Sequence, residues 1–428
     1  MRMWRLMTVL LFTTLRAEEP TDSVLYVRQI VIVGNETTKE HVILREMSLK
    51  VGHRLTMASL EHDQKRIYSL QLFTRVDLDY ETDGDQATLY VRVAERWYIF
   101  PIPILGFKYR DTKKFFYGLG FIHENFRGRN EKLVASFALG FDRWVSLAYQ
   151  NPKLTDGDDI FFRGYVTYSS VQNQNVAQGL YQQKVFAGSV TVGKRFGLYQ
   201  TALGIAGYED WRISDPRAGR TVSLSGRDRF LMVGWRYTLD TRDLREYPTS
   251  GHYLSISASK FGFGESEVNL YRAGYDLRGF TLVTGDIVLG VRTFGNLVRG
   301  GVSPNYLHSY FGYDERIRGH FKSVLEGESL VGGNAEVRFP ILSPRYVEVS
   351  TKFLPPEFSV WRYGLSVGVF ADGGKTWYRT QSFGTAPWYS GAGAGVHFLL
   401  PYSLILRTEY AVNNLGKGEF VLDFGSSF

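Results

Sequence analysis

The chain has 428 residues, a formal net charge of +7 and no cysteine. The absence of cysteine excludes disulfide staples, zinc–thiolate sites and a lipidated cysteine near the N-terminus. Aromatic residues make up 15% of the sequence, yet the mean hydropathy is −0.17, and no apolar run approaches the roughly 18–20 residues of a spanning helix. The chain is therefore a soluble β-rich protein or a membrane β-barrel, whose strands need only half of their residues apolar.

Residues 1–17 have the layout of a secretory signal peptide. Arg2 and Arg5 precede an apolar core at residues 6–15, and Ala17 is a small residue of the kind found at cleavage sites. The alternative is a buried N-terminal helix, but no capping residue or continuing helical pattern supports it. We therefore expect export from the cytoplasm.

Residues 24–96 are predicted to form a small α/β domain. The run VLYVRQIVIVGN indicates a strand that ends in a Gly-Asn turn, and TTKEHVILREM and LTMASLEHDQKRIYSL place apolar residues at helical spacing. Two alternating segments, LFTRVDLDYE and QATLYVRVAE, then flank the turn sequence TDGDQ. The predicted element order is β-α-α-β-β.

This segment resembles a POTRA domain, the polypeptide-transport-associated module. The matching residues, in order, are Ile30, Val33, Gly34, Asn35, Ile43, Arg45, Glu46, Gly52, Leu55, Leu60, Asp63, Arg66, Ile67, Tyr68, Leu72, Phe73, Val76 and Glu95. The resemblance implies a periplasmic domain that binds extended chains by strand addition at a sheet edge. The strand assigned to that client-binding edge consists of Phe73, Thr74, Arg75, Val76, Asp77, Leu78, Asp79 and Tyr80.

Beyond Trp97 the helical period gives way to alternation. In LVASFALGF every second residue, starting at Leu133, is apolar, and LYRAGYDLRG and SLILRTEY alternate in the same way. A soluble sandwich and a membrane barrel share this pattern, but the many strands, the missing helices and the signal peptide favour the barrel. About sixteen such segments follow residue 98. The predicted fold is an α+β domain followed by an all-β transmembrane barrel of about 16 antiparallel strands over residues 98–428.

Several stretches of the barrel half resemble the BamA-type POTRA–barrel superfamily. IRGH at residues 317–320 is similar to the family's loop motif, and GGNAEVRFP, FADGG, DTRD and the terminal FVLDFGSSF are similar to its strand motifs. The resemblance implies that a loop near residues 295–331 folds into the barrel lumen. The motif residues are Ile317, Arg318, Gly319 and His320, and the inner-wall partners of the arginine are Asp372 and Glu336.

The physics of a confined lumen agrees with this assignment. A guanidinium needs a fixed anion there and binds a carboxylate with two hydrogen bonds, and Gly319 permits a tight turn. His320 stands where the family has an aromatic residue, so it either replaces that ring or makes the contact pH-sensitive. Asp314, Glu315 and Arg316 receive no role beyond polarity of the loop or lumen.

Motifs of covalent chemistry or cofactor binding were not found. The sequence around Ser329 lacks the second glycine of a nucleophile elbow, and the eight histidines show no zinc-binding spacing. We expect no enzyme activity, no cofactor and no metal. No block of lysine or arginine predicts nucleic-acid binding.

Three functions remain for an outer-membrane barrel with a periplasmic POTRA domain. The first is an assembly or insertion factor for other barrels, whose partners are unfolded outer-membrane proteins, membrane lipid and possible accessory subunits. The second is a dedicated pore that secretes one partner polypeptide. The third is a passive channel, for which a POTRA domain is unnecessary. Lateral insertion requires a weak seam between the first and last strands, which we assign to Leu105, Phe424, Gly425 and Phe428.

Overall fold

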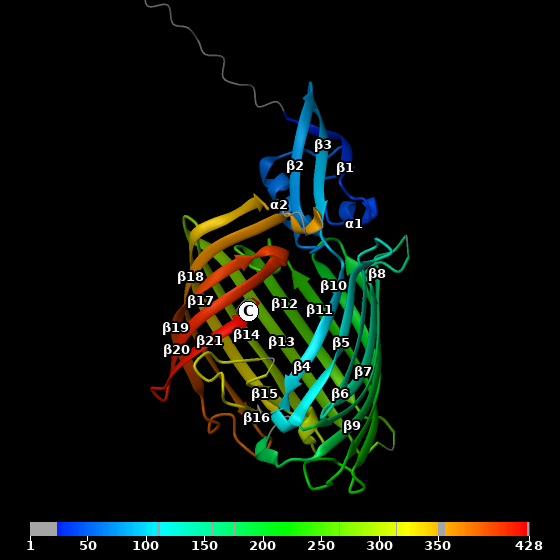
Figure 1. Cartoon of the computed structure of the whole chain (residues 1–428), viewed down its shortest axis with the longest axis vertical. Helices are drawn as coiled ribbons and strands as arrows, with labels where there is room; N and C mark the ends of the chain where they lie inside the picture. Colours follow the sequence, from blue (N-terminus) through cyan, green and yellow to red (C-terminus); the bar gives the residue numbers. More distant parts are fainter. Residues whose placement is uncertain are drawn as a thin grey trace, which may run out of the picture.

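The computed structural model describes residues 24–108, 112–155, 157–173, 176–264, 266–313, 315–349, 356–425 and 428. The predicted signal peptide and Asp314 lie outside the described residues. Within the described part, no helix has the length and apolarity to cross a membrane. A small three-stranded sheet with two helices precedes a sixteen-stranded sheet, and Figure 1 shows the small unit seated on one end of the barrel.

The small unit has the predicted β-α-α-β-β order. Its elements are β1 (Tyr26–Val33), α1 (Glu40–Leu44), α2 (Met57–Tyr68), β2 (Phe73–Asp83) and β3 (Gln86–Glu95). The sheet order is β1-β3-β2, with β1 parallel and β2 antiparallel to β3. Thr56 and Ser59 form a reciprocal capping box that starts α2 by satisfying free backbone N–H groups. One apolar cluster, which includes Ile43, Ile67 and Leu89, fills the space between helices and sheet.

The large sheet consists of sixteen strands in antiparallel ladders between sequence neighbours, except that β14 pairs with β17 across a long loop. Its strands are β4 (Ile99–Phe107), β5 (Phe115–Phe126), β6 (Glu131–Gly140), β7 (Arg143–Asn151), β8 (Ile160–Gln172), β9 (Gln182–Phe196), β10 (Gln200–Ile213), β11 (Arg227–Asp240), β12 (Gly251–Phe261), β13 (Leu270–Thr284), β14 (Ile287–Gly300), β17 (Ser329–Glu348), β18 (Val360–Trp377), β19 (Tyr389–Leu400), β20 (Leu404–Asn413) and β21 (Gly418–Phe424). This count confirms the predicted fold class.

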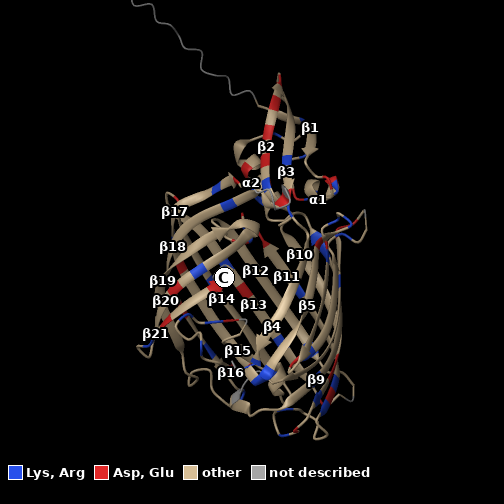
Figure 2. Ribbon diagram, viewed as in Figure 1, with Lys and Arg blue, Asp and Glu red and all other residues tan. Residues whose placement is uncertain are grey.

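The barrel wall has apolar residues outside and polar residues inside. Along β9, Phe186, Val190 and Val192 are 44–47% exposed, whereas the alternate residue Gln183 is buried. Deep in the lumen, Glu336, Arg338, His397 and Glu409 are all at most 1% exposed. Figure 2 shows acidic and basic residues close together around β20 and β21. The alternation thus places apolar side chains toward lipid and charges toward the lumen.

The small unit is bound to the barrel rim by buried ion pairs. The Glu46 carboxylate accepts hydrogen bonds from Arg66 at 2.7 Å and from Arg195 of β9 at 2.8 Å. Arg66 also donates to the Leu198 carbonyl at 2.9 Å in the turn after β9. Burial by itself raises the pKa of Glu46, but the hydrogen bond and charge of Arg195 and the charge of Arg66 outweigh it and lower the pKa to about 2. The rim contact therefore holds an ionised carboxylate.

Candidate functional site: the lumen loop and the ends of the sheet

The loop between β14 and β17 extends from residue 301 to residue 328. The predicted range, 295–331, included the ends of both strands, since β14 continues to Gly300 and β17 begins at Ser329. Inside the loop, β15 (Ser309–Phe311) and β16 (Leu325–Gly327) form a two-stranded hairpin. Residues 312–324 are the tip between these two strands, and the IRGH motif lies on that tip.

Arg318 binds three carboxylates on three different strands. Its Nε and Nη2 atoms donate to the two oxygens of Asp372 on β18, both at 2.7 Å. Its Nη1 atom donates to Glu336 on β17 at 2.6 Å and to Glu409 on β20 at 3.0 Å. The backbone N–H of Arg318 also donates to Asp372 at 3.1 Å. One side chain thereby connects the loop to three strands of the wall.

The environment of Arg318 keeps it charged. Its residue exposure is 5%, and its guanidinium carbon lies 3.6 Å from the ring centre of Phe370. Burial alone lowers the pKa of Arg318, but the hydrogen bond to Asp372 and the charges of Asp372, Glu336 and Glu409 raise it above its ordinary value. Arg318 is therefore a permanent cation, and the surrounding carboxylates balance its positive charge.

Sequence reasoning placed Asp372 and Glu336 near Arg318 and missed the third acid, Glu409. It also missed the second layer of cations. Arg338 donates to Glu336 at 2.7 Å, and Arg407 donates to Glu409 at 3.1 Å. Alternation along residues 403–410 identified Arg407 and Glu409 as sharing one face of a strand. Only the register of β17 to β20 brings these side chains to the loop arginine.

Glu336, His397 and Glu409 place potential ligand atoms within 4.8 Å of one another. Both Glu336 oxygens accept from arginines, Arg318 and Arg338, and Glu409 accepts from Arg318 and Arg407. A divalent cation would have to displace these guanidinium groups. The cluster is a compensated ion network in which arginine supplies the positive charge.

The other motif residues fix the loop tip against β19 and the turn after β20. Ile317 is 2% exposed and packs in a small apolar cluster with Phe294, Phe311 and Leu330. Gly319 has φ +93°, a conformation that favours glycine, and its carbonyl accepts from the Asn413 side chain at 2.7 Å.

His320 takes the place of an aromatic ring and also forms a polar contact. Its ring meets Tyr389 edge-to-face at 5.3 Å between centroids, and its Nε2 atom lies 2.9 Å from Asn414 Oδ1. Within the described residues, no acidic group is paired with His320. The edge-to-face packing agrees with the ring-replacement alternative.

Glu315 and Arg316 have partners that the sequence did not predict. Glu315 accepts two hydrogen bonds from Arg292 of β14, at 2.8 and 2.9 Å. Arg316 lies 3.7 Å from Asp423, and its guanidinium carbon is 4.2 Å from the ring centre of Phe321. Its side chain is 37% exposed, against 6% for Arg318. The two arginines are therefore a matched pair, one solvated and one buried.

The strands assigned to the seam, β4 and β21, are the two ends of the sixteen-stranded sheet, and no ladder joins them within the described residues. Leu105 is 71% exposed and Phe424 66%. Gly425 has φ +103°, and the Phe428 ring lies 5.8 Å from that of Phe280 on β13 at 4% exposure. Phe428 is thus folded against the inner wall, unlike the expected seam residue, because its ring finds an apolar surface there.

The strand assigned to client binding, β2, is an edge of the small sheet. Its barrel-proximal half lies next to the rim, where Arg75 is 3.9 Å from Glu348 of β17. Phe73 and Val76 in this half are buried in the apolar core of the small unit itself. The distal half is open, and every residue from Asp79 to Asp83 is exposed. The contact with Glu348 thus marks a docked half of the strand, and the exposed residues beyond it form a free half.

Two family models match the chain. The POTRA model, described as surface antigen variable number repeat, matches residues 25–96, and the Omp85 superfamily domain matches residues 125–428. Among curated relatives, the chain is 26% identical to the outer membrane protein assembly factor BamA of Neorickettsia risticii, over 92% of this chain and 53% of that protein. It is 23% identical to BamA of Nitratidesulfovibrio vulgaris, over 69% of this chain and 38% of that one. The chain spans about half or less of the length of these relatives.

Solved structures show the same fold at lower identity. BamA from Haemophilus ducreyi lacking POTRA domains 1–3 aligns with a TM-score of 0.56 at 18% identity, covering 94% of this chain and 83% of that one. CdiB from Escherichia coli aligns with a TM-score of 0.52 at 9% identity, covering 98% and 91%. With the Omp85 model matching well over half of its residues, the chain belongs to the Omp85 superfamily, as an outer-membrane barrel whose POTRA region lies in the periplasm.

Proposed function

We propose that this protein inserts β-barrel proteins into the outer membrane by opening between β4 and β21. The observation that carries the proposal is the pair of unbonded terminal strands, since within the described residues the ladders run from β21 to β4 without joining them. A strand edge without a partner presents free backbone N–H and C=O groups to an incoming chain. An unfolded barrel protein supplies strands that satisfy those groups.

Local chemistry weakens both edges. Pro101 and Pro103 of β4 have no N–H group to donate to a ladder. On β21, the strand ends at Phe424, and the chain then turns away at Gly425 toward the lumen. Because no ladder joins β4 and β21 within the described residues, opening there costs less than parting two strands that share a full ladder.

The lumen loop gives the wall next to the seam its rigidity. Arg318 ties the loop to β17, β18 and β20, and Arg407 connects β20 to Asp423 of β21 at 3.0 Å. The network holds the last strands as one unit while β4 remains outside it. Opening is therefore expected at β4–β21 and not between strands within the network.

The POTRA edge supplies the second part of the proposed activity. The free half of β2, from Asp79 to Asp83, has room for an extended chain to add to the sheet. The docked half places that edge beside the barrel rim through Arg75 and Glu348. A client bound at β2 is thus held close to the periplasmic mouth of the barrel.

A disulfide across the two end strands tests the proposal. The chain has no cysteine, so pairs can be introduced by scanning residues 105–107 against residues 422–424 for Cα atoms within about 4.4–6.8 Å. The full chain in liposomes is given a urea-unfolded outer-membrane barrel, and insertion is followed by the heat-dependent gel mobility of the client. We expect oxidation to slow insertion and reductant to restore it.

The matched control is Ser136→Cys with Ser146→Cys, on the paired strands β6 and β7, where the two hydroxyl oxygens lie 2.7 Å apart. This lock joins strands that are not expected to separate, so insertion should continue. If the β4–β21 lock leaves insertion as fast as the control lock does, opening at this seam is not the mechanism. Export of one polypeptide through the lumen, the dedicated secretion pore, would then be the better account.

A further inference from the structure

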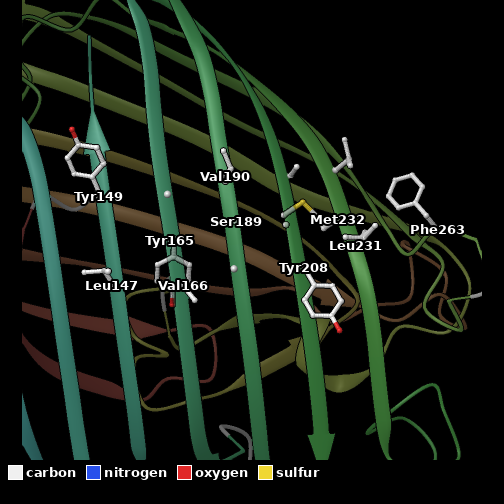
Figure 3. A pocket seen from close by; sticks show the side chains of 15 residues that line it. Leu147, Tyr149, Tyr165, Val166, Ser189, Val190, Tyr208, Leu231, Met232 and Phe263 are labelled. Carbon is white, nitrogen blue, oxygen red and sulfur yellow. The ribbon is translucent and has the colours of Figure 1, made fainter. Parts of the chain in front are cut away.

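A groove crosses the outer face of the barrel on strands β7 to β11. It has a volume of about 910 Å³, and Figure 3 shows its side chains along neighbouring strands with the far wall of the barrel behind them. One row of paired residues runs through it: Leu147, Val166, Gly188, Tyr208 and Leu231. Paired residues on adjacent strands share a face, and Leu147 and Leu231 are 48% and 54% exposed. The groove therefore faces lipid.

The recess results from a missing side chain. Gly188 lies in the centre of the row, between Val166 of β8 and Tyr208 of β10. A Cβ atom at Gly188 would find only the Tyr165 carbonyl oxygen, at 3.6 Å, within 4 Å. Open space thus lies directly over the glycine, and apolar side chains form its walls.

Basic residues lie on the same face toward the loop end of these strands. Arg229 precedes Leu231 by two residues on β11, which places it about 7 Å further along that face. The next row toward the loops, beyond that of Arg229, consists of five residues paired across β7 to β11: Arg143, Ser170, Lys184, Arg212 and Arg227. The POTRA contact of Arg195 marks the opposite, periplasmic end of β9. The cations therefore face the outer leaflet.

The charge of this patch is not balanced by the wall. The row of Arg229 and the row of Arg227 together hold five cations and one carboxylate. The carboxylate belongs to Asp210, which is paired with Arg229 in the ladder, accepts from Arg227 at 2.9 Å and lies 3.3 Å from Arg212. Arg229 and Lys184 have no acidic partner within the described residues. A row of cations next to an apolar groove is complementary to a molecule with a negative head and a hydrocarbon chain.

We propose that the groove is a binding site for an anionic phospholipid. One acyl chain lies over Gly188, and the phosphate lies against Arg229 and Arg227. Arginine binds phosphate through several N–H groups in a fixed plane, and burial of methylene groups in the recess adds apolar contact. The occupant is a whole lipid, since the apolar and the charged parts of the site are contiguous.

Lipid binding by the full chain in detergent, measured by native mass spectrometry, tests the proposal. The probes are phosphatidylglycerol and phosphatidylcholine with identical acyl chains. We expect phosphatidylglycerol to bind more tightly, and the double change Arg227→Gln with Arg229→Gln to lower its affinity roughly tenfold or more. The matched control is Arg299→Gln, a cation on the outward face at the loop end of β14, outside the groove; it should leave affinity unchanged.

A second pair of variants tests the apolar half. Gly188→Leu fills the recess and should weaken both lipids several-fold, with Gly188→Ala intermediate. Gly204→Leu is its control, because Gly204 is an outward glycine of β10 outside the lining, with only the Val192 carbonyl oxygen, at 3.8 Å, near a new Cβ. Heat-dependent gel mobility checks that each barrel is folded.

Three results would overturn the proposal. The first is equal affinity of the wild-type chain for the two lipids. The second is an equal loss from a variant and from its control. The third is displacement of bound phosphatidylglycerol by millimolar inorganic phosphate, which would show an anion site that does not use the groove.

Discussion

The POTRA unit and the barrel bury opposite kinds of residues. In the POTRA unit, Ile43, Ile67 and Leu89 are all 0% exposed and form an apolar interior. In the barrel, Phe186 and Leu231 are about half exposed, while Arg338 and Glu409 are 1% exposed. The same physical effect explains both units, because apolar side chains are removed from water in each of them. Water surrounds the POTRA unit, and lipid surrounds the barrel.

The difference also decides how each interior is held together. Apolar packing in the POTRA unit is not directional, and its strength follows the area removed from water. The barrel interior depends on ion pairs of Arg318, Arg338 and Arg407 with carboxylates. Removal of one partner leaves the other charge buried and uncompensated in a low-dielectric interior. The barrel should therefore be sensitive to single polar changes and the POTRA unit to single apolar ones.

The largest expected effect is that of Arg318→Ala. It leaves Asp372, Glu336 and Glu409 without their shared cation, at a cost of roughly 3–5 kcal/mol. Arg316→Ala, two residues away on the half-exposed side of the loop, should cost far less. Urea unfolding of the barrel, followed by gel mobility without boiling, measures both. Equal and mild effects would mean that the loop motif is solvated.

The apolar counterpart is Leu89→Ala in the POTRA unit. Loss of a fully buried leucine costs roughly 2–5 kcal/mol, because it leaves a cavity. Leu297→Ala on the lipid face of β14, 39% exposed, leaves a gap that lipid fills, so its cost should be smaller. Limited proteolysis should show a cut POTRA unit with an intact barrel for Leu89→Ala. If both changes destabilise their units equally, lipid does not fill the gap.

The contact between the two units should depend on pH through Glu46. The folded pKa, about 2, lies below the ordinary value of 4.5, so its contribution is complete above pH 4.5 and is lost as the pH falls from 4.5 to 2. Glu46→Gln should weaken docking by roughly 1–3 kcal/mol at neutral pH and remove this dependence. Spin labels on the β2–β3 turn and on the barrel rim report the distance distribution.

A distribution that broadens below pH 4.5 in the wild-type chain, but is already broad at neutral pH in Glu46→Gln, is the expected pattern. Lys65→Gln is the control, because its pair with Asp243 at 3.2 Å spans the same interface but leaves its lysine 42% exposed. A wild-type distribution that stays narrow down to pH 2 would show that Glu46 does not hold the units together.

The smallest effect is expected from His320→Phe. The ring contact with Tyr389 is kept and the hydrogen bond to Asn414 is lost, so barrel stability should fall by about 1 kcal/mol or less. The same urea titration at pH 5 and pH 8 tests the pH-sensitive alternative. A stability difference between the two pH values that disappears in His320→Phe would support a switch at this residue.

Much of the fold was predictable because its periodicities are local. Helical spacing around Ile43 and Ile67 and alternation along residues 133–141 depend only on neighbours in the chain. The loop limits were predicted too wide, because the ends of β14 and β17 are set by their ladder and not by composition. Placement of Asp372 and Glu336 rested on motif resemblance, and their contacts with Arg318 depend on register.

The sequence by itself determined which residues could face lipid and which could not, since a strand alternates faces whatever its partners are. Tertiary structure decided which charges meet. Glu409 joins Arg318 across 91 residues of chain, and Glu46 joins Arg195 across 149. The position of Arg229 on the outer face, two strands away from Gly188 and in the next row, likewise follows from the register of β9, β10 and β11. Contacts of this kind arise only when the ladders have fixed the relative shift of the strands, because a shift of one residue turns every side chain to the other face.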